Sequence, residues 1–294
     1  MKALLPIVAG VGPSSRWLPA GPWKTVLDFL SEEYSQVHVE TWTTRMTRGA
    51  VIDENGRRVA PDTAYRAGAC IFYYRELDDE PVIPFVEQVL YQDEHILVAD
   101  KPHFLPVIPS GRFLHQTLLV RLRKKYNHEG LVPIHRLDRE AAGVILFSVN
   151  PETRRHYTSL FRDRKIKKVY EALAPTLEAA KLPDVRRSRI VRGEPFFRMK
   201  EVPGEANSET EVIRLRNLGS NSLYQLIPVT GKKHQLRLHL AALGIPIIND
   251  KLYPEMSRSD RDDFSRPLKL LAKSLSFQDP LSGRQLYFES GTRL

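Results

Sequence analysis

The sequence predicts an α+β fold built on a mixed β-sheet, preceded by a smaller N-terminal region. Short apolar runs typical of strands outnumber the amphipathic stretches typical of helices, and their spacing along the chain is irregular. The acidic stretch at residues 76–81 ends in proline and is soon followed by Pro84, which is typical of a linker. We therefore expect a domain boundary near residue 84, which divides the chain into regions 1–84 and 85–294.

The N-terminal region carries one strong local signal. Residues 51–59 contain two short apolar segments around Asn55-Gly56, a pair that is typical of a β-hairpin turn. Residues 71–74 form an apolar run that predicts a strand, and residues 37–42 predict either a strand or the start of a helix.

The second region mixes strands with helices. Residues 117–126 place basic side chains between apolar ones and predict an amphipathic helix. Asn150-Pro151 predicts the N-cap and first turn of another helix, in which Tyr157, Leu160 and Phe161 share one face. Strands are predicted from apolar runs at residues 96–99, 143–149, 169–173 and 224–229.

The composition is that of a soluble globular protein of 294 residues, with 42% apolar and 27% charged residues. The formal net charge of +9 favours a polyanionic partner, and nucleic acid is the usual one. No apolar run approaches the roughly 18 residues that a membrane helix needs. The apolar start of the chain is short and interrupted by Pro6, unlike a signal peptide. We expect a soluble protein with no membrane partner.

Cysteine and histidine usage argues against disulfides and metals. Cys70 is the single cysteine, so the chain forms no internal disulfide and no cysteine-rich metal site. This usage fits a reducing compartment, and we expect a cytoplasmic location. His234 and His239 lie five residues apart, which suits neither one face of a helix nor a known zinc spacing. We therefore expect no metal ion.

Asp138 is the residue whose surroundings indicate chemistry. It lies between Arg136 and Arg139, just before the predicted strand at residues 143–149. Nearby cations favour the charged form of a carboxyl group and lower its pKa. An ionised carboxylate serves as a nucleophile, a base or a transition-state stabiliser at a sugar carbon. On local composition alone, a structural Asp–Arg pair in a loop is at least as well supported.

Several segments, in register from about residue 85 to residue 294, resemble the RluA/RluD-type pseudouridine synthases. The segments are HRLD at residues 135–138 with Gly143-Val144, KVYEAL at 168–173, TGKKHQLRLHL at 230–240, and weaker matches at 96–111 and 244–253. The resemblance implies a mixed, largely antiparallel sheet with flanking helices. It also implies an isomerase that converts uridine in RNA to pseudouridine and needs no cofactor, because reactant and product are isomers.

The resemblance also implies roles for individual residues. Asp138 is implied as the catalytic aspartate, Tyr170 as the ring that stacks on the flipped uracil, and Arg237 as the partner of Asp138. Arg136 is implied to enter the space that the flipped base leaves. Further residues of these motifs that we expect to bind substrate are His135, Lys168, Lys232, Lys233 and Gln235.

The expected partner is structured RNA, with large-subunit ribosomal RNA as first choice, transfer RNA as second, and a monomeric enzyme. Basic clusters at residues 154–168 and 186–192 suit phosphate contacts, and a solvated helix face is the alternative for the first of them. Residues 45–75 faintly resemble the small alpha-L RNA-binding fold, and an unrelated structural hairpin is nearly as well supported.

The sequence also departs from the family pattern. Ala141-Ala142 replace the usual Thr-Ser, which removes two hydroxyls from the catalytic loop, and Lys232-Lys233 replace the usual arginine and small hydroxyl residue. Two rival functions stay open. One is a non-catalytic RNA-binding or ribosome-assembly protein on the same fold, in which Asp138 is dispensable. The other is a glycoside hydrolase, which normally needs two carboxylates flanking the sugar.

Overall fold

Two sheets organise the chain in the computed structural model, which describes residues 5–77, 79–257 and 262–294. Asp78 of the predicted linker and residues 1–4 therefore lie outside the described residues. The first sheet is formed by β1 (Ser14–Trp17), β2 (Val51–Asp53) and β3 (Cys70–Tyr73), accompanied by α1 (Val26–Glu33) and α2 (Val39–Thr47). Its strand order is β1-β3-β2, and both pairings run antiparallel.

The second sheet holds the other strands of the described residues. They are β4 (Gln88–Gln92), β5 (Ile96–Lys101), β6 (Val132–Pro133), β7 (Ala142–Ser148), β8 (Ile166–Pro175), β9 (Val185–Arg192), β10 (Met199–Val202), β11 (Ser208–Leu218), β12 (Asn221–Pro228), β13 (Leu270–Gln278) and β14 (Gln285–Glu289). The helices of this part are α3 (Leu118–Tyr126), α4 (Arg154–Arg162), α5 (Gln235–Ala242) and a short 3-10 turn at Ala179–Lys181.

The N-terminal unit has its own core. Phe29 and Leu30 of α1 and Trp42 of α2 are buried against Val51 and Ile71 of the sheet. The predicted turn at Asn55-Gly56 is present, because residues 51 and 53 exchange backbone hydrogen bonds with residues 59 and 57 across it. The longer pairing of β2, however, is with β3. Residues 37–42 lead into α2 and form its first turn, so the start of a helix is the alternative that the structure shows.

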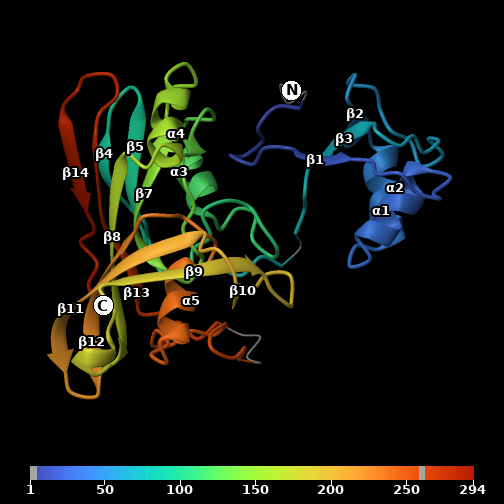
Figure 1. Cartoon of the computed structure of the whole chain (residues 1–294). Helices are drawn as coiled ribbons and strands as arrows, with labels where there is room; N and C mark the ends of the chain where they lie inside the picture. Colours follow the sequence, from blue (N-terminus) through green and yellow to red (C-terminus); the bar gives the residue numbers. More distant parts are fainter. Residues whose placement is uncertain (1–4, 78, 258–261) are drawn as a thin grey trace.

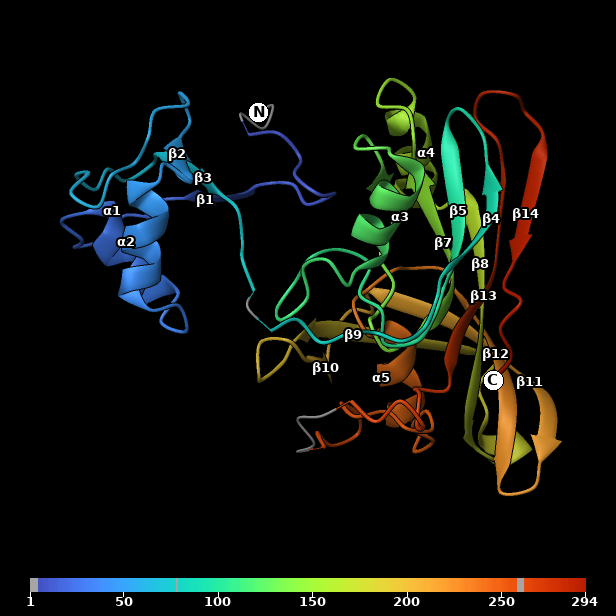
Figure 2. The same cartoon turned by 180° about the vertical axis from the view of Figure 1, so that it is seen from behind.

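Figures 1 and 2 show the N-terminal unit set apart from the large sheet, on the side where α3 lies. Besides the stretch that follows β3, the two parts meet where the chain before β1 reaches α3. Val11 packs against Leu114 and Val120, and the Arg123 guanidinium donates to the carbonyl oxygen of Gly10 at 3.1 Å.

The large sheet is mixed, as the sequence predicts, and largely antiparallel, as the resemblance implies. Its order is β10-β9-β11-β12-β8-β13-β7-β5-β4, with β14 beside β13 and β6 beside β7. Strands β13 and β7 run parallel, and the other pairings of the described residues in this sheet run antiparallel. The α+β fold class is therefore confirmed.

Helices bury both faces of the sheet centre, which explains the unbroken apolar runs of β5 and β7. Ile145 and Phe147 face the cluster that contains Leu119 and Leu122 of α3. Their neighbours Val144 and Leu146 face the opposite cluster, with Tyr157 and Leu160 of α4. Helix α5 packs Leu236 and Leu240 on β8 and β12.

One predicted helix start is wrong. Helix α4 begins at Arg154, with Thr153 at the N-cap position, rather than directly after Asn150. The Asn150 side chain instead accepts from the backbone N–H of Glu152 at 2.9 Å, which closes a turn before the helix. The shared face of Tyr157 and Leu160 is buried as predicted.

The parallel pairing of β7 with β13 places the loop that carries Asp138. Gly143 has φ of +117°, and a Cβ built there falls 2.2 Å from the carbonyl oxygen of Ala272. Only glycine fits this approach, because any side chain collides with the backbone of β13. The loop before β7 is thereby set next to β13 and its neighbour β8.

Candidate active site

The loop between β6 and β7 carries Asp138 and is held from several directions. The side chain of Leu137 packs against two hydrophobic clusters. The N–H of Ala141 donates to the carbonyl oxygen of Asp138 at 3.2 Å and closes a turn. The fully buried Lys101 of β5 donates from Nζ to the carbonyl oxygen of Arg139 at 3.0 Å. The backbone on both sides of Asp138 is therefore fixed.

Arg237, in the first turn of α5, makes the ion pair with Asp138. Its Nη1 donates to Asp138 Oδ2 at 3.1 Å. Asp250 engages the other side of the guanidinium, with Nε to Oδ2 at 2.8 Å and Nη2 to Oδ1 at 2.6 Å. The side chains of Arg237 and Asp250 are each 1% exposed. This two-pronged pair fixes the guanidinium plane and leaves Nη1 for Asp138.

The charge on Asp138 depends on this arginine. Burial by itself raises the pKa of the Asp138 carboxyl, but the charge and hydrogen bond of Arg237 hold that pKa below its ordinary value. Burial lowers the pKa of the nearby His234, so that its imidazole is neutral at pH 7 and Arg237 is the main counter-charge. Asp138 is thus an ionised carboxylate whose side chain is 26% exposed.

Tyr170 of β8 joins the same centre. Its ring packs beside the cluster that contains Ala141 and Leu236, from the Asp138 loop and from α5. Burial first, and then the negative charge of Asp138, raise the pKa of Tyr170, so its phenol stays protonated at neutral pH. The structure therefore brings Asp138, Tyr170 and Arg237 together.

His234 and Tyr253 form a second set of contacts at Asp138. His234 Nε2 lies 3.9 Å from Asp138 Oδ1, and His234 Nδ1 lies 3.0 Å from the Tyr253 hydroxyl. The guanidinium carbon of Arg237 lies 5.7 Å from the centre of the Tyr253 ring. Tyr253 comes from the loop after α5, where Asp250 also accepts from its backbone N–H.

Arg139, the neighbour of Asp138, is bound to Asp262. Its Nη1 and Nη2 donate to the two carboxylate oxygens of Asp262, each at 2.8 Å. Arg112 donates to the same carboxylate at 2.7 Å. This contact ties the Asp138 loop to the segment that precedes β13.

Two predicted substrate-binding residues are engaged inside the protein. The Nε2 atom of His135 accepts from the backbone N–H of Leu146 at 3.0 Å, and its ring stacks on Phe161. Burial, and then the charge of Lys168, lower the pKa of His135 to about 4, so the ring is neutral. The amide of the buried Gln235 hydrogen-bonds Thr230, Lys232, Glu209 and Thr210.

The four predicted cations lie at the surface or near it. Arg136, Lys232 and Lys233 are exposed, and Lys168 is half-buried. Burial lowers the pKa of Lys168, and its Nζ lies 3.9 Å from the position that a Cβ of Gly231 takes. Lys168 thus stands next to the loop that carries Lys232 and Lys233.

Sequence reasoning missed Asp250, His234, Tyr253, Lys101 and Asp262 as functional residues. Asp250 and Tyr253 belong to the weak match at residues 244–253, which assigned them no role. The contacts that connect these five residues to the Asp138 loop join segments far apart in the chain. Within residues 5–77, 79–257 and 262–294, no group of three histidine, cysteine, aspartate or glutamate side chains is arranged to hold a metal ion.

Comparisons with known proteins agree with this geometry. Residues 95–242 match the RNA pseudouridylate synthase family, and this range includes Asp138, Tyr170 and Arg237. The chain is 32% identical over 214 residues to the dual-specificity RNA pseudouridine synthase RluA of Haemophilus influenzae, which covers 71% of this chain and 94% of that protein. It is 30% identical over 233 residues to an uncharacterised RNA pseudouridine synthase of Synechocystis, with 78% and 79% covered.

A solved structure gives the same result. The human RNA Pseudouridylate Synthase Domain Containing 4 aligns with a TM-score of 0.54 at 26% identity, over 70% of this chain and 88% of that one. No helix among the described residues is long and apolar enough to cross a membrane. The chain belongs to the RNA pseudouridylate synthase family, of the RluA type, and is an isomerase that converts uridine to pseudouridine in RNA.

Proposed function

We propose that Asp138, Tyr170 and Arg237 form the catalytic centre and that the chain isomerises one specific uridine in structured RNA. The observation that supports this most directly is the 3.1 Å contact between Arg237 Nη1 and Asp138 Oδ2. Because Arg237 is itself fixed by Asp250, the carboxylate stays charged and keeps one direction.

The reaction follows from an ionised carboxylate beside a ribose. The bond between N1 of uracil and C1′ breaks while Asp138 acts on the ribose, as nucleophile or as stabiliser of positive charge. The detached uracil turns and stays bound beneath the Tyr170 ring. A new bond joins C5 to C1′, C5 gives up its proton and N1 gains one, so the isomerisation balances without a redox partner.

Access to the uridine requires that it leave its stack. Extruding a nucleotide costs a few kcal/mol, so a group that fills the vacated space favours the extruded state. Arg136 suits this role, because its side chain is exposed and has no hydrogen bond or ion pair with another described residue. Its position two residues before Asp138 keeps it beside the reacting nucleotide.

The predicted substrate-binding residues divide into two groups. We assign Lys168, Lys232 and Lys233 to contacts with RNA phosphates, because Lys232 and Lys233 are exposed and Lys168 lies next to their loop. His135 and Gln235 already use their polar atoms within the protein, so we assign them to shaping the pocket rather than to direct contact.

Large-subunit ribosomal RNA is our first choice of substrate and transfer RNA our second. The Haemophilus relative is named a dual-specificity enzyme, and this name supports proposing two classes of RNA substrate. The single cysteine favours the cytoplasm, and we expect a monomer.

We also propose that residues 1–84 act as a separate RNA-contacting domain of the alpha-L type, ahead of the catalytic domain at 85–294. The presence of a separate sheet and core supports the division. Arg57, Arg58 and Arg66 are exposed on this unit. Residues 1–84 nevertheless hold nine Lys and Arg against eleven Asp and Glu, so any RNA contact there is local.

Pseudouridine mapping of total RNA tests the proposal. Cells that lack the gene should lose pseudouridine at one or a few positions, and the position identifies the substrate. A wild-type copy should restore the modification, whereas a copy with Asp138→Asn should not. A map that is identical with and without the gene would contradict the proposal, and loss confined to transfer RNA would remove the ribosomal assignment.

A further inference from the structure

His234 occupies a position that no role in the proposed reaction explains. It precedes α5 directly, with a left-handed backbone at φ of 55°. Its side chain is 8% exposed and lies between the Tyr253 hydroxyl and Asp138. A buried imidazole between a phenol and a carboxylate presents one ring nitrogen to each of them.

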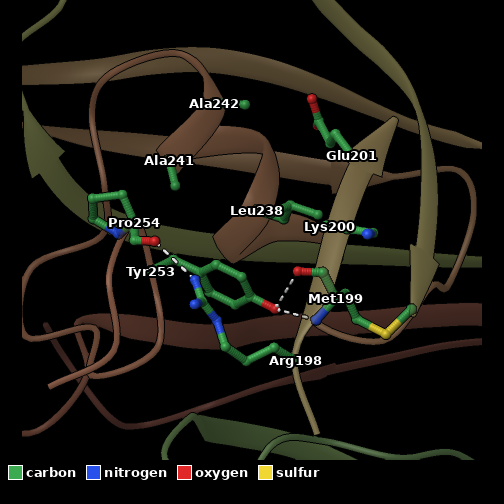
Figure 3. Close-up of a pocket in the computed structure, with 9 residues that line it drawn as sticks. All are labelled: Arg198, Met199, Lys200, Glu201, Leu238, Ala241, Ala242, Tyr253 and Pro254. Carbon is green, nitrogen blue, oxygen red and sulfur yellow. Dashed lines mark hydrogen bonds between the residues drawn. The ribbon is translucent and has the colours of Figure 1, made fainter. Parts of the chain in front are cut away.

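The hydrogen bonds of Tyr253 restrict the orientation of this imidazole. The backbone N–H of Met199, in β10, donates to the Tyr253 hydroxyl oxygen at 2.8 Å, and the Met199 carbonyl oxygen lies 3.3 Å away (Figure 3). The hydroxyl proton therefore has two acceptors in reach, and His234 Nδ1 is the nearer one at 3.0 Å.

The charge of Asp138 selects between the two neutral forms of His234. If Nδ1 carried the proton, the lone pair of Nε2 would face a negative carboxylate oxygen at 3.9 Å. If Nδ1 accepts from Tyr253, Nε2 carries the proton and faces that oxygen with an N–H. The second form is electrostatically favoured, and it also satisfies the hydroxyl proton of Tyr253.

We infer that His234 is a positioning residue that directs its Nε2–H at Asp138 Oδ1, with its tautomer set by Tyr253. The inference rests on the proposed role of Asp138. Arg237 holds Oδ2 and His234 faces Oδ1, so the two together fix the rotation of the carboxylate about its last bond. The 3.9 Å distance is longer than a hydrogen bond, and we expect it to shorten when RNA binds, since catalytic hydrogen bonds are often long without substrate.

The inference links β10 to the carboxylate. A groove of about 240 Å³ lies between α5 and β10, and Tyr253 and Met199 both line it (Figure 3). Movement of β10 therefore reaches Asp138 through one hydroxyl and one imidazole. This gives the arginine-rich hairpin of β9 and β10 a physical connection to the catalytic residue.

Two amide substitutions separate the roles of the two ring nitrogens. In His234→Gln the amide lies near the place of Nε2 and still offers an N–H to Asp138. In His234→Asn the amide lies near Nδ1, which keeps the contact with Tyr253 and loses the one with Asp138. A left-handed backbone tolerates asparagine better than glutamine, so a purely structural role favours the Asn variant.

We expect the opposite order in single-turnover and steady-state assays on an RNA substrate. The Asn variant should lose at least about tenfold in kcat, or about 1.4 kcal/mol, with KM for RNA unchanged. The Gln variant should keep most of the wild-type kcat. A result in which Asn equals or exceeds Gln, or in which KM alone changes, would overturn the inference.

Tyr253→Phe gives a second, independent measurement. The substitution should lower kcat in the wild-type background and have little further effect in the His234→Asn background, because the same route is already broken. Full additivity of the two substitutions would argue against the link. Asp138→Asn is assayed alongside: if that variant stays active the proposed function fails, whatever the His234 variants do.

Discussion

At the scale of single residues, the ionisation of Asp138 depends on Arg237, and other side chains hold the Arg237 guanidinium in place. Arg237 is buried among three carboxylates: Asp250 takes the two-pronged contact, Asp138 accepts from Nη1, and Glu140 lies 3.8 Å from the same nitrogen. A buried arginine without such a partner carries a large desolvation cost, so the pair with Asp250 is what permits a cation beneath Asp138.

Arg136 provides a prediction about base extrusion. Arg136→Ala should lower activity on folded RNA by roughly tenfold, and much less on a substrate whose target uridine is already unstacked, because only the former must pay the extrusion cost. Initial rates on a stem and on a matching open strand give the comparison. Arg136→Lys keeps the charge and serves as control. Equal losses on both substrates would remove the role from Arg136.

Two histidines that the fold keeps neutral predict how stability depends on pH. Burial lowers the pKa of His135 and of His239 to about 4, whereas an unfolded chain titrates near 6.5. Between these values the unfolded state binds more protons, so the free energy of unfolding falls as pH falls from 6.5 toward 4. The loss should reach about 2 kcal/mol per histidine by pH 4.5.

Urea unfolding at pH 7 and at pH 4.5 measures this loss. His239→Gln removes one of the two titrating groups, and its stability should depend less steeply on pH than that of the wild type. A variant with the same pH dependence as the wild type would show that His239 is not a source of the effect.

The sequence predicted part of this centre at the residue scale. Asp138, Tyr170 and Arg237 were assigned from a motif pattern, and the structure brings them together. His234 was considered only as a metal ligand, which its spacing from His239 argues against. Its relation to Tyr253, 19 residues later, depends on the path of the loop after α5, which periodicity does not encode.

At the scale of elements, the loop before β7 is held by charge and packing instead of by loop hydroxyls. Ala141 and Ala142 are fully buried, in the places where hydroxyl residues are usual in the family. Lys101 binds the carbonyl oxygen of Arg139 from one side, and Asp262 binds its guanidinium from the other. These contacts keep the backbone at Asp138 in place.

A substitution at Asp262 therefore tests whether the Asp138 loop needs the contact between Arg139 and the segment before β13. Asp262→Asn removes the charge of the two-pronged partner of Arg139 and leaves Glu140, at 3.0 Å, as its one charged partner among the described residues. We expect kcat to fall by about tenfold, or about 1.4 kcal/mol, with the fold retained. Arg112→Ala is the matched control, since it removes the other partner of Asp262 and leaves the Arg139 contact intact. Steady-state kinetics on one RNA substrate should separate the two variants. Similar losses in both would contradict a specific role for the Arg139 contact.

The elements with clear apolar periodicity were the ones that could be predicted. Helix α3 and strand β7 follow the predicted ranges closely, because burial on one or both faces imposes the pattern. Strand β9 was not predicted, since half of its residues are arginines and its pairing with β11 depends on distant residues. At Asn150, a local side-chain turn displaced the expected helix start.

At the scale of the whole molecule, charge and fold are unevenly shared. Residues 1–84 carry more Asp and Glu than Lys and Arg, so the formal net charge of +9 comes from residues 85–294. Figure 2 shows the N-terminal unit set apart from the large sheet, on the side where α3 lies. The electrostatic part of RNA affinity should come mainly from the catalytic part.

This distribution predicts the salt dependence of RNA binding. A chain that begins at residue 79 should keep most of the slope of log affinity against log salt, because phosphate neutralisation determines that slope. Filter binding or fluorescence anisotropy at several salt concentrations provides the slopes for both chains. A slope that falls by half or more on truncation would place the phosphate contacts on the N-terminal unit.

The most direct test of the account is the turnover of Asp138→Asn. The substitution keeps the shape of the side chain and removes its charge, while Arg237 retains Asp250. Pseudouridine formation should be abolished, and RNA affinity should change by less than about tenfold, or about 1.4 kcal/mol. The exposed Asp263→Asn is the control and should behave as wild type. An Asp138→Asn protein with full turnover would contradict the assignment of the catalytic centre.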